Sequence, residues 1–311
     1  MRKIARRNLT ATIAALAVVA GTASQVQAAP TVPDRGDARG AAQIVAARLG
    51  PIAHTTSTGD ALTADLTADV TARIPMDAHG VVALAGPAPT TLAVSLPAQA
   101  KTHNAIVDNH GAVVYSAESK NDTALVVEPL ASGKVSIQTV IPNAGASNRY
   151  TYQLQSGVTA VERTDGGLDL VAVDPASGLK VGVGSVDAPW AFDASGAVVP
   201  TRYEVSGSTF TQVVQLSKSL TYPVVADPTY GWSYWVIPTA YLNWSESLKA
   251  ASDPAGVGVI CAVVGLWNAP AGVLCAAETW YINSGAKTAV SHGKCVTLML
   301  GAGVGVFERN C

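Results

Sequence analysis

The chain has 311 residues, of which 49% are hydrophobic and only 14% are charged, and its 20 Lys and Arg nearly balance its 22 Asp and Glu. A slightly acidic chain without clustered Lys and Arg is a poor candidate for binding nucleic acid, because that binding requires neutralisation of phosphates. The length is sufficient for two hydrophobic cores.

The first 28 residues have the pattern of a signal peptide. Four basic residues lie among the first seven, and an apolar run follows at 13–20 that is too short for a stable membrane anchor. Val26-Gln27-Ala28 suits a signal peptidase, so we expect cleavage after Ala28 and export of the protein to the cell envelope or the extracellular space. Cleavage would remove four of the 20 basic residues and none of the 22 acidic residues, which leaves a net charge of −6.

Residues 29–60 are rich in Ala, Gly, Thr and Pro and are expected to form a flexible leader. Within this leader, the run ARGAAQIVAARL from Ala38 predicts one helix, for which Asp37 would be the N-cap.

Residues 61–228 are predicted to form a β domain, either a sandwich or an elongated antiparallel sheet. Short runs rich in β-branched residues recur every 8–12 residues or so, with turn residues between them. The runs are GVVALAG, TLAVSL, AIVDNHGAVVY, TALVVE, KVSIQTVI, YTYQLQ, VTAVER, LDLVAV, LKVGVGSV, VVPTRYEV, TFTQVVQL and YPVVA.

A turn signature occurs three times in this domain. The copies are Asp77-Ala-His79-Gly80, Asp108-Asn-His110-Gly111 and Asp193-Ala-Ser195-Gly196. The Asp–His pairs resemble metal ligands, but the third copy has Ser at the His position. Asp can accept a backbone hydrogen bond two residues on, and Gly can adopt a positive φ. We therefore interpret the signature as a structural turn and assign no metal ligand.

The sequence changes character around Asp227-Pro228. Val224 to Ala226 reads as the last strand of the β domain, and five of the six Trp follow Gly231. We therefore place a domain boundary between residues 228 and 229. The aromatic residues that follow it are candidates for an interaction site, because such rings stack on sugars or lie at membrane interfaces. These candidates are Trp232, Tyr234, Trp235 and Tyr241.

Residues 229–311 are predicted to form a small α+β module. Thr239–Ser252 has helical spacing, and no charged residue occurs from Pro254 to Ala277. Two readings of this uncharged stretch are open. It is either a single membrane-inserting segment, for which about 20 apolar residues suffice, or a helical hairpin that turns at Asn268-Ala269-Pro270. The turn-like sequence and the absence of a basic cluster after the stretch favour the hairpin.

All four cysteines lie in this module, and four cysteines allow three disulfide connectivities. The midpoint of Cys261 and Cys275 is the suspected helical turn, and the midpoint of Cys295 and Cys311 is in Gly301-Ala302-Gly303, between two strand-like runs. Each pair would thus face itself across its own hairpin, within disulfide range. A zinc site made of the four thiolates is disfavoured, because no CxxC motif occurs and exported cysteines are usually oxidised.

Two stretches carry a resemblance to known proteins. PWAFDASGAVVPTRYEV, followed by YPVVADPTY, a Gly- and Ala-rich helical segment with cysteines and a GKCV…C ending, resembles a group of secreted actinobacterial proteins that share a Tyr-Pro-Val-x-Ala-Asp-Pro seam. The resemblance covers roughly residues 185–311. It implies no activity, and no catalytic residues carry over.

The functional reading rests on the absence of recognisable catalytic sequence motifs, and we assign no catalytic residue and no cofactor. The first hypothesis is a secreted or envelope-associated, non-enzymatic protein, in which the β scaffold presents the disulfide-tied module to an envelope or protein partner. The second is a membrane-active, bacteriocin-like antibacterial effector whose C-terminal module acts on a target membrane. The third is a hydrolase with an unrecognised site that uses His79, His110 or His292.

Overall fold

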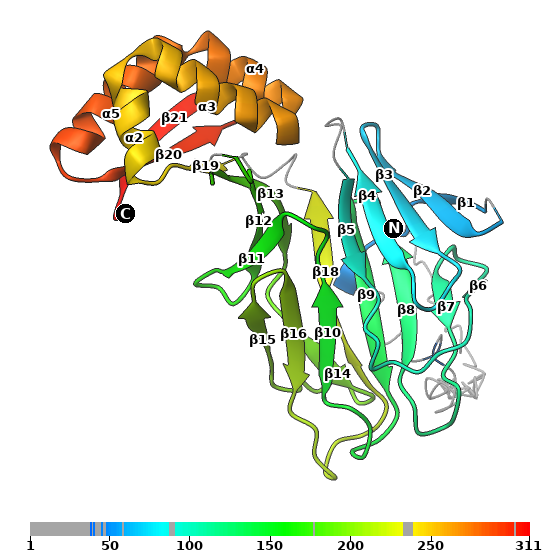
Figure 1. The fold of residues 1–311 in the computed structure, drawn as a ribbon. Helices are drawn as coiled ribbons and strands as arrows, with labels where there is room; N and C mark the ends of the chain where they lie inside the picture. The colour runs from blue at the N-terminus through cyan, green and yellow to red at the C-terminus, as the bar shows by residue number, and fades with distance from the viewer. Residues whose placement is uncertain are drawn as a thin grey trace, which may run out of the picture. The chain divides into compact units, whose positions relative to one another are not determined.

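The structure is a computed structural model that describes residues 38, 40, 45, 48–57, 59–86, 91–176, 178–232, 239–301 and 303–311. For Trp232 it describes the backbone alone. These residues form 21 β-strands and, near the C-terminus, four α-helices. The expected signal peptide, its cleavage site and the Asp37 cap lie outside the described residues. The expectation of a mainly β chain with a small α+β disulfide-stabilised end is confirmed (Figure 1).

Residues 48–57 are more ordered than the sequence analysis expected of a leader. Helical backbone occurs at Arg48 and Leu49, and Ile52 forms a bridge to Leu130. β1 (His54–Ser57) then pairs with the next strand. The expectation of a flexible leader up to residue 60 is therefore wrong for this part. The reason is that Val45 and Leu49 pack on the outer surface of the central sheet, where they contribute to a small apolar cluster.

The first sheet has five antiparallel strands in chain order, β1 to β5. In β4 and β5, buried and more exposed residues alternate, as expected when one face of a sheet covers a core. The strands after β1 are β2 (Ala61–Thr67), β3 (Val70–Pro75), β4 (Val81–Ala85) and β5 (Thr91–Ser95).

The central sheet has 13 strands, and its main path runs β21-β20-β19-β13-β18-β9-β8-β7-β6. β8 and β9 are buried almost throughout, since the main core lies on one face and the small cluster around Val45 on the other. The strands from the middle of the chain are β6 (Ile106–Val107), β7 (Val113–Tyr115), β8 (Ala124–Pro129), β9 (Lys134–Ile141), β11 (Val158–Glu162), β12 (Leu168–Val173), β13 (Lys180–Val186), β14 (Ala191–Asp193), β17 (Val224–Ala226) and β18 (Thr229–Trp232).

A third sheet has the strand order β10-β16-β15, with β10 (Arg149–Gln153), β15 (Thr201–Ser206) and β16 (Thr209–Val214). One hydrophobic core joins the three sheets, because side chains such as Leu92, Ile137 and Phe210 belong to a single buried cluster. We call residues 48–232 the β body. All of the runs predicted to be strands contain strands in the structure.

The three predicted turns also form as expected. In each, the Asp side chain accepts a hydrogen bond from the backbone N–H two residues on, at 3.0 Å for His79, 2.8 Å for His110 and 2.9 Å for Ser195. The glycine N–H of each turn donates to the carbonyl of the same Asp. Gly111 and Gly196 adopt the expected positive φ, but Gly80 does not. At Gly80 a side chain is instead excluded by Pro75, whose Cβ would lie 2.5 Å from an added Cβ. The Asp and Gly of the signature are thus explained by backbone geometry and, at Gly80, by this contact.

The β body continues one strand beyond the predicted seam. β17 at Val224–Ala226 is a strand, as predicted, but β18 at Thr229–Trp232 also belongs to the body, where it pairs with β9 and β13. β13 then pairs with β19 (Thr239–Tyr241), so the central sheet extends into the C-terminal module. A break at Asp227-Pro228 does not end the body, because Pro228 still provides its carbonyl to Ile137 N–H.

The C-terminal module consists of β19, four helices and a β-hairpin around a core of its own. β19 corrects the predicted helix at 239–252, because α2 begins only after Asn243. Glu278 ends the second helix of the predicted hairpin, and a further helix follows it. The elements are α2 (Trp244–Ser252), α3 (Pro254–Trp267), α4 (Ala269–Ala277), α5 (Thr279–Ser291), β20 (Cys295–Leu300) and β21 (Val304–Arg309).

Candidate interaction surface

The uncharged stretch of the module forms a helical hairpin. Asp253 caps α3 by accepting from Gly256 N–H at 2.6 Å, and Asn268 caps α4 by accepting from Ala271 N–H at 3.0 Å. Pro is the first or second residue of both helices, where its missing N–H costs nothing. The helical-hairpin reading is therefore confirmed. No helix in the described part of the chain has the length and apolar character needed to cross a bilayer.

Disulfides join both hairpins of the module in the predicted way. Cys261 of α3 is bonded to Cys275 of α4, with a Cα–Cα distance of 5.3 Å. Cys295 is bonded to Cys311, and these two residues bracket the β20–β21 hairpin. Cys261, Cys275 and Cys295 are buried. The helices of the first hairpin therefore turn their cysteines toward the module core.

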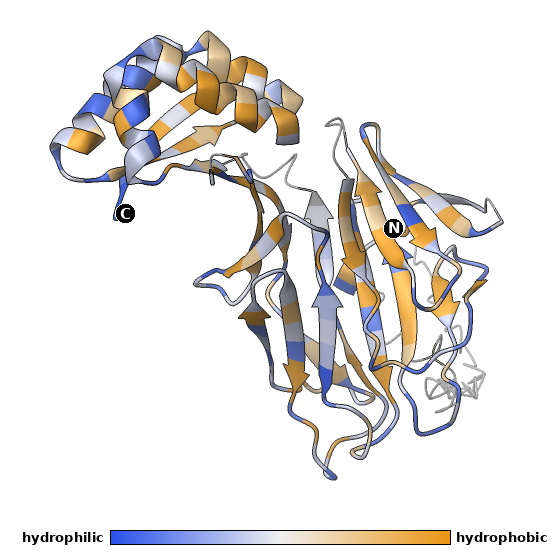
Figure 2. Cartoon of the chain, in the orientation of Figure 1, coloured by the Kyte–Doolittle hydropathy of each residue, from blue (hydrophilic) through white to orange (hydrophobic). Residues whose placement is uncertain are grey.

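The outward side of α3 and α4 carries only apolar residues. Val257, Ile260 and Val264 of α3 and Ala271 of α4 point into the module core, so the residues between them face outward. Leu266 is 58% exposed and Val273 is 73% exposed. We call the exposed residues of the two helices the apolar face: Ala255, Val259, Ala262, Leu266, Ala269, Pro270, Val273, Ala276 and Ala277. In Figure 2 the hydrophilic colour of the module is found mainly on α2, α5 and the segment near the C-terminus.

Two exposed aromatic residues follow the apolar face in the chain. Trp280 and Tyr281, in the first turn of α5, are 76% and 53% exposed. Neither residue was among the aromatic candidates predicted from the sequence. The module contains several aromatic residues, and the sequence does not show which of their rings pack in the core. The exposure of Trp280 and Tyr281 could therefore not be predicted from the sequence.

Of the four aromatic residues proposed for an interaction site, the structure describes the side chain of Tyr241 alone. Tyr234 and Trp235 lie outside the described residues, as does the side chain of Trp232. Tyr241 lies in β19, where it is half-buried, and burial raises the pKa of its hydroxyl. Their role in binding stays a prediction.

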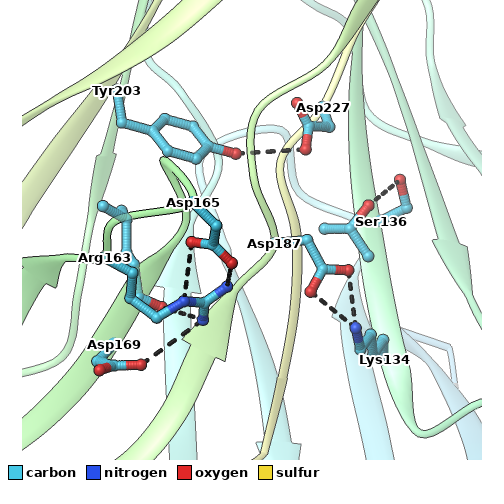
Figure 3. Close-up of polar contacts among 10 residues, drawn as sticks. Lys134, Ser136, Arg163, Asp165, Asp169, Asp187, Tyr203 and Asp227 are labelled. Carbon is cyan, nitrogen blue, oxygen red and sulfur yellow. Dashed lines mark hydrogen bonds and ion pairs between the residues drawn. The ribbon is translucent and has the colours of Figure 1, made fainter.

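The polar clusters of the β body consist of groups that bind each other (Figure 3). Lys134 Nζ lies 2.7 Å from both carboxylate oxygens of Asp187. Arg163 forms ion pairs with Asp165 at 2.9 Å and Asp169 at 3.6 Å. These contacts connect β9, β11 and β12 to adjacent turns, which is a structural role.

Asp227 of the predicted seam is fully buried and is held by three donors. Its Oδ1 accepts from Trp190 N–H at 2.9 Å and from Gln212 Nε2 at 3.0 Å, and Tyr203 Oη donates to Oδ2 at 3.3 Å (Figure 3). Burial raises the pKa of Asp227 to about 8, although the hydrogen bonds from Trp190 and Tyr203 lower it. The buried carboxyl therefore links β15 and β16 to Trp190, the residue before β14, and lies directly after β17.

The histidines of the hydrolase hypothesis lie in three separate places. His79 and His110 are exposed in their own turns. His292 ends α5, and its Nδ1 lies 2.8 Å from Glu308 Oε1 of β21 in an exposed contact. Among the described residues, no group of three or more His, Cys, Asp or Glu is placed to hold a metal ion. The structure thus brings no predicted histidine next to another.

A small pocket of about 240 Å³ lies between the helical N-terminal residues and the central sheet. Its lining is apolar except for Arg48, whose guanidinium carbon lies 4.0 Å from the ring centroid of Phe192. Trp190 packs beside Phe192, with 5.7 Å between their ring centroids. Arg48 is the one charged side chain of this lining, and it is stacked on Phe192, so the pocket offers little polar chemistry.

No protein-family model matches the chain, and no curated protein matches it either. Among solved structures, the family 92 glycosyl hydrolase ccman5 aligns with 72% of this chain and 35% of its own chain, at 11% identity and a TM-score of 0.26. The chain therefore spans about a third of the length of that structure. A likeness at this level carries no argument about fold or activity.

Proposed function

We propose that the chain is a secreted or envelope-associated, non-enzymatic protein whose β body is a scaffold for the C-terminal module. The observation that supports this best is the apolar face. Exposed apolar patches of this kind on soluble proteins are usually places where something else binds. The module holds this face in a defined shape through its two disulfides and its own core.

Two further observations support the proposal. Disulfides form and persist in oxidising compartments, and the two pairs here involve all four cysteines of the chain. This agrees with export, as the N-terminal sequence pattern predicts. In addition, the ionisable clusters of the β body bind one another, as structural groups do. A scaffold that presents a binding module requires no catalytic group in the β body or in the module.

The proposal is tested by crosslinking from the apolar face. A photo-crosslinking amino acid replaces Leu266 in the full chain, and the matched control carries it at Val198, an exposed position of the β body. We expect adducts with an envelope component from position 266 and not from position 198. Equal labelling from both positions would contradict the proposal, as would turnover of an envelope polymer by the purified protein.

A second function is favoured by the same uncharged hairpin, namely a membrane-active antibacterial effector. From Pro254 to Ala277 the hairpin contains no ionised group that would resist entry into a bilayer. The test is leakage of a trapped dye from liposomes by the full chain, oxidised and reduced. Leakage in either state supports an effector, and intact liposomes in both states exclude it.

A further inference from the structure

We propose that the apolar face docks on the interfacial region of a lipid bilayer and that this docking does not depend on anionic lipid. The inference rests on the proposed function, in which the C-terminal module is the part that binds. It specifies the partner as an uncharged, hydrocarbon-containing surface, and it places α3 and α4 against that surface.

The chemistry of the apolar face fits lipid better than it fits protein. Protein interfaces contain about one hydrogen bond per 100–200 Å² and use these bonds to set the register of the partners. The exposed side chains of α3 and α4 are Ala, Val, Leu and Pro, which neither donate nor accept hydrogen bonds. A partner that is complementary to such a surface is also uncharged and forms no hydrogen bonds with it. The acyl region of a bilayer has both properties.

The backbone at the tip of the hairpin is also prepared for an apolar environment. A backbone group without a partner costs several kcal/mol in hydrocarbon. At the turn between the helices, Asn268 N–H donates to Val264 O at 2.8 Å, and Gly272 N–H donates to Asn268 O at 2.9 Å. The Asn268 side chain, which is itself buried, satisfies Ala271 N–H. The side chain of Asn268, the polar residue at the tip, is thus buried and hydrogen-bonded to the backbone.

The residues that adjoin the apolar face in the chain support the same partner and explain the independence from anionic lipid. Trp280 and Tyr281 have apolar rings with a polar tip, which is the side-chain type enriched at membrane–water interfaces. The charged residues nearest in sequence, Asp253 and Glu278, are both acidic. Ordinary interfacial helices use Lys and Arg to reach anionic headgroups. This hairpin lacks them, so the attraction comes from apolar burial.

The hairpin is too short to span the bilayer, so it docks on one leaflet. α3 has 14 residues, which corresponds to about 21 Å at 1.5 Å per residue. The hydrocarbon core is about 30 Å thick. The disulfide between Cys261 and Cys275 keeps the two helices together, so both present their outward sides at once.

Vesicle flotation of the full chain tests the inference. Vesicles of phosphatidylcholine alone are compared with vesicles of phosphatidylcholine and phosphatidylglycerol at a 3:1 ratio, each at low and high salt. The variants are Val273→Asp in the apolar face and Val198→Asp in the β body, which are matched because both side chains are 73% exposed. Circular dichroism and intact mass establish that each variant is folded and fully disulfide-bonded.

We expect the wild type and Val198→Asp to float equally with both vesicles at both salt concentrations. Val273→Asp should partition about tenfold less, because a charge is costly in the acyl region. The inference is overturned by flotation that requires phosphatidylglycerol, by flotation that Val273→Asp leaves unchanged, or by no flotation. Self-association that Val273→Asp abolishes would instead assign the face to a second copy. If crosslinking from position 266 reaches a protein while flotation fails, the lipid inference falls and the proposed function stands.

Discussion

Gly265 of α3 and Gly272 of α4 pack backbone to backbone. A Cβ built on Gly272 would lie 2.4 Å from the Gly265 Cα and 3.1 Å from Cys261 O, distances that no side chain tolerates without movement of the backbone. The absence of a side chain at position 272 is therefore what allows the two helices of the hairpin to approach this closely. The Cys261–Cys275 bond lies next to this contact in the chain.

Gly272→Ala should destabilise the module because it forces α3 and α4 apart. Overpacking of this kind typically costs about 1–3 kcal/mol. The matched control is Gly258→Ala, also in a helix of the hairpin, where an added Cβ meets nothing within 4 Å. That variant should gain about 0.5–1 kcal/mol, because Ala restricts the unfolded chain. Urea unfolding, monitored by hydrogen exchange of the module, measures the free energy of unfolding of both variants. Equal effects in the two variants would refute the close-packing argument.

Removal of the Cys261–Cys275 disulfide should cost the module about 3 kcal/mol on the chain-entropy model for a loop of this size. The bond closes a loop with a sequence separation of 14 residues. The double variant Cys261→Ser/Cys275→Ser is compared with wild type by the rate of limited proteolysis within residues 239–311. We expect faster cleavage there and an unchanged rate within β8 and β9. An unchanged rate in the module would show that the hairpin holds without its disulfide.

The Asp193 turn should matter far more to stability than the Asp77 turn. Asp193 is buried and accepts from the N–H groups of Ser195, Ala197 and Thr221, whereas Asp77 is exposed and accepts from His79 N–H. Asp193→Ala should cost about 2–4 kcal/mol and Asp77→Ala about 1 kcal/mol or less. Chemical denaturation of the β body measures the difference, and similar losses would contradict this account.

The pKa of Asp193 gives the same turn a pH dependence. Burial by itself would raise this pKa, but the hydrogen bonds from Ser195, Thr221 and Ala197 lower it below its ordinary value. A lowered pKa means that the folded protein binds fewer protons at Asp193 than the unfolded chain. The contribution of Asp193 to the free energy of unfolding is therefore lost as the pH falls through the folded pKa.

Asp227 should have the opposite effect on stability. Its pKa rises from an ordinary 3.8 to about 8 because of burial. Between these values the folded protein binds more protons at this site than the unfolded chain, so the free energy of unfolding should fall as the pH rises from about 4 to 8. Burial likewise raises the pKa of Glu128 to about 7.

Asp227→Asn tests this expectation, because an amide keeps the acceptor for Trp190 and Gln212 without the ionisation. Unfolding in urea at a series of pH values should show a shallower decline for the variant than for wild type. Glu128→Gln should flatten the lower part of the same range. Parallel curves for Asp227→Asn and wild type would mean that Asp227 does not carry the pH dependence.

The predicted strands of the β body and its three Asp turns were predictable because their signals are local, although β1, β2, β3 and β14 were not among the predicted runs. Alternation within five to eight residues identifies a strand, and Asp-x-x-Gly supplies both the acceptor and the flexible backbone of a turn. β18 and β19 were missed for the opposite reason. Each is three or four residues long, and β19 is a strand because β13 and β20 lie on either side of it. Thr239–Tyr241 by itself has spacing that also fits the start of a helix.

The candidate surface shows the same division. The turn-like sequence within the uncharged stretch from Pro254 to Ala277 and the cysteine midpoints are properties of the chain, and they favoured a disulfide-tied hairpin over a membrane-inserting segment. Which apolar residues would be left outside was not in the chain, because Val273 and Val264 are the same residue type at similar distances from the turn. Only the packing of α3 and α4 on the module core decides that one is 73% exposed and the other fully buried. Residue type sets what a surface can bind, whereas contact with the rest of the fold sets which residues make up that surface.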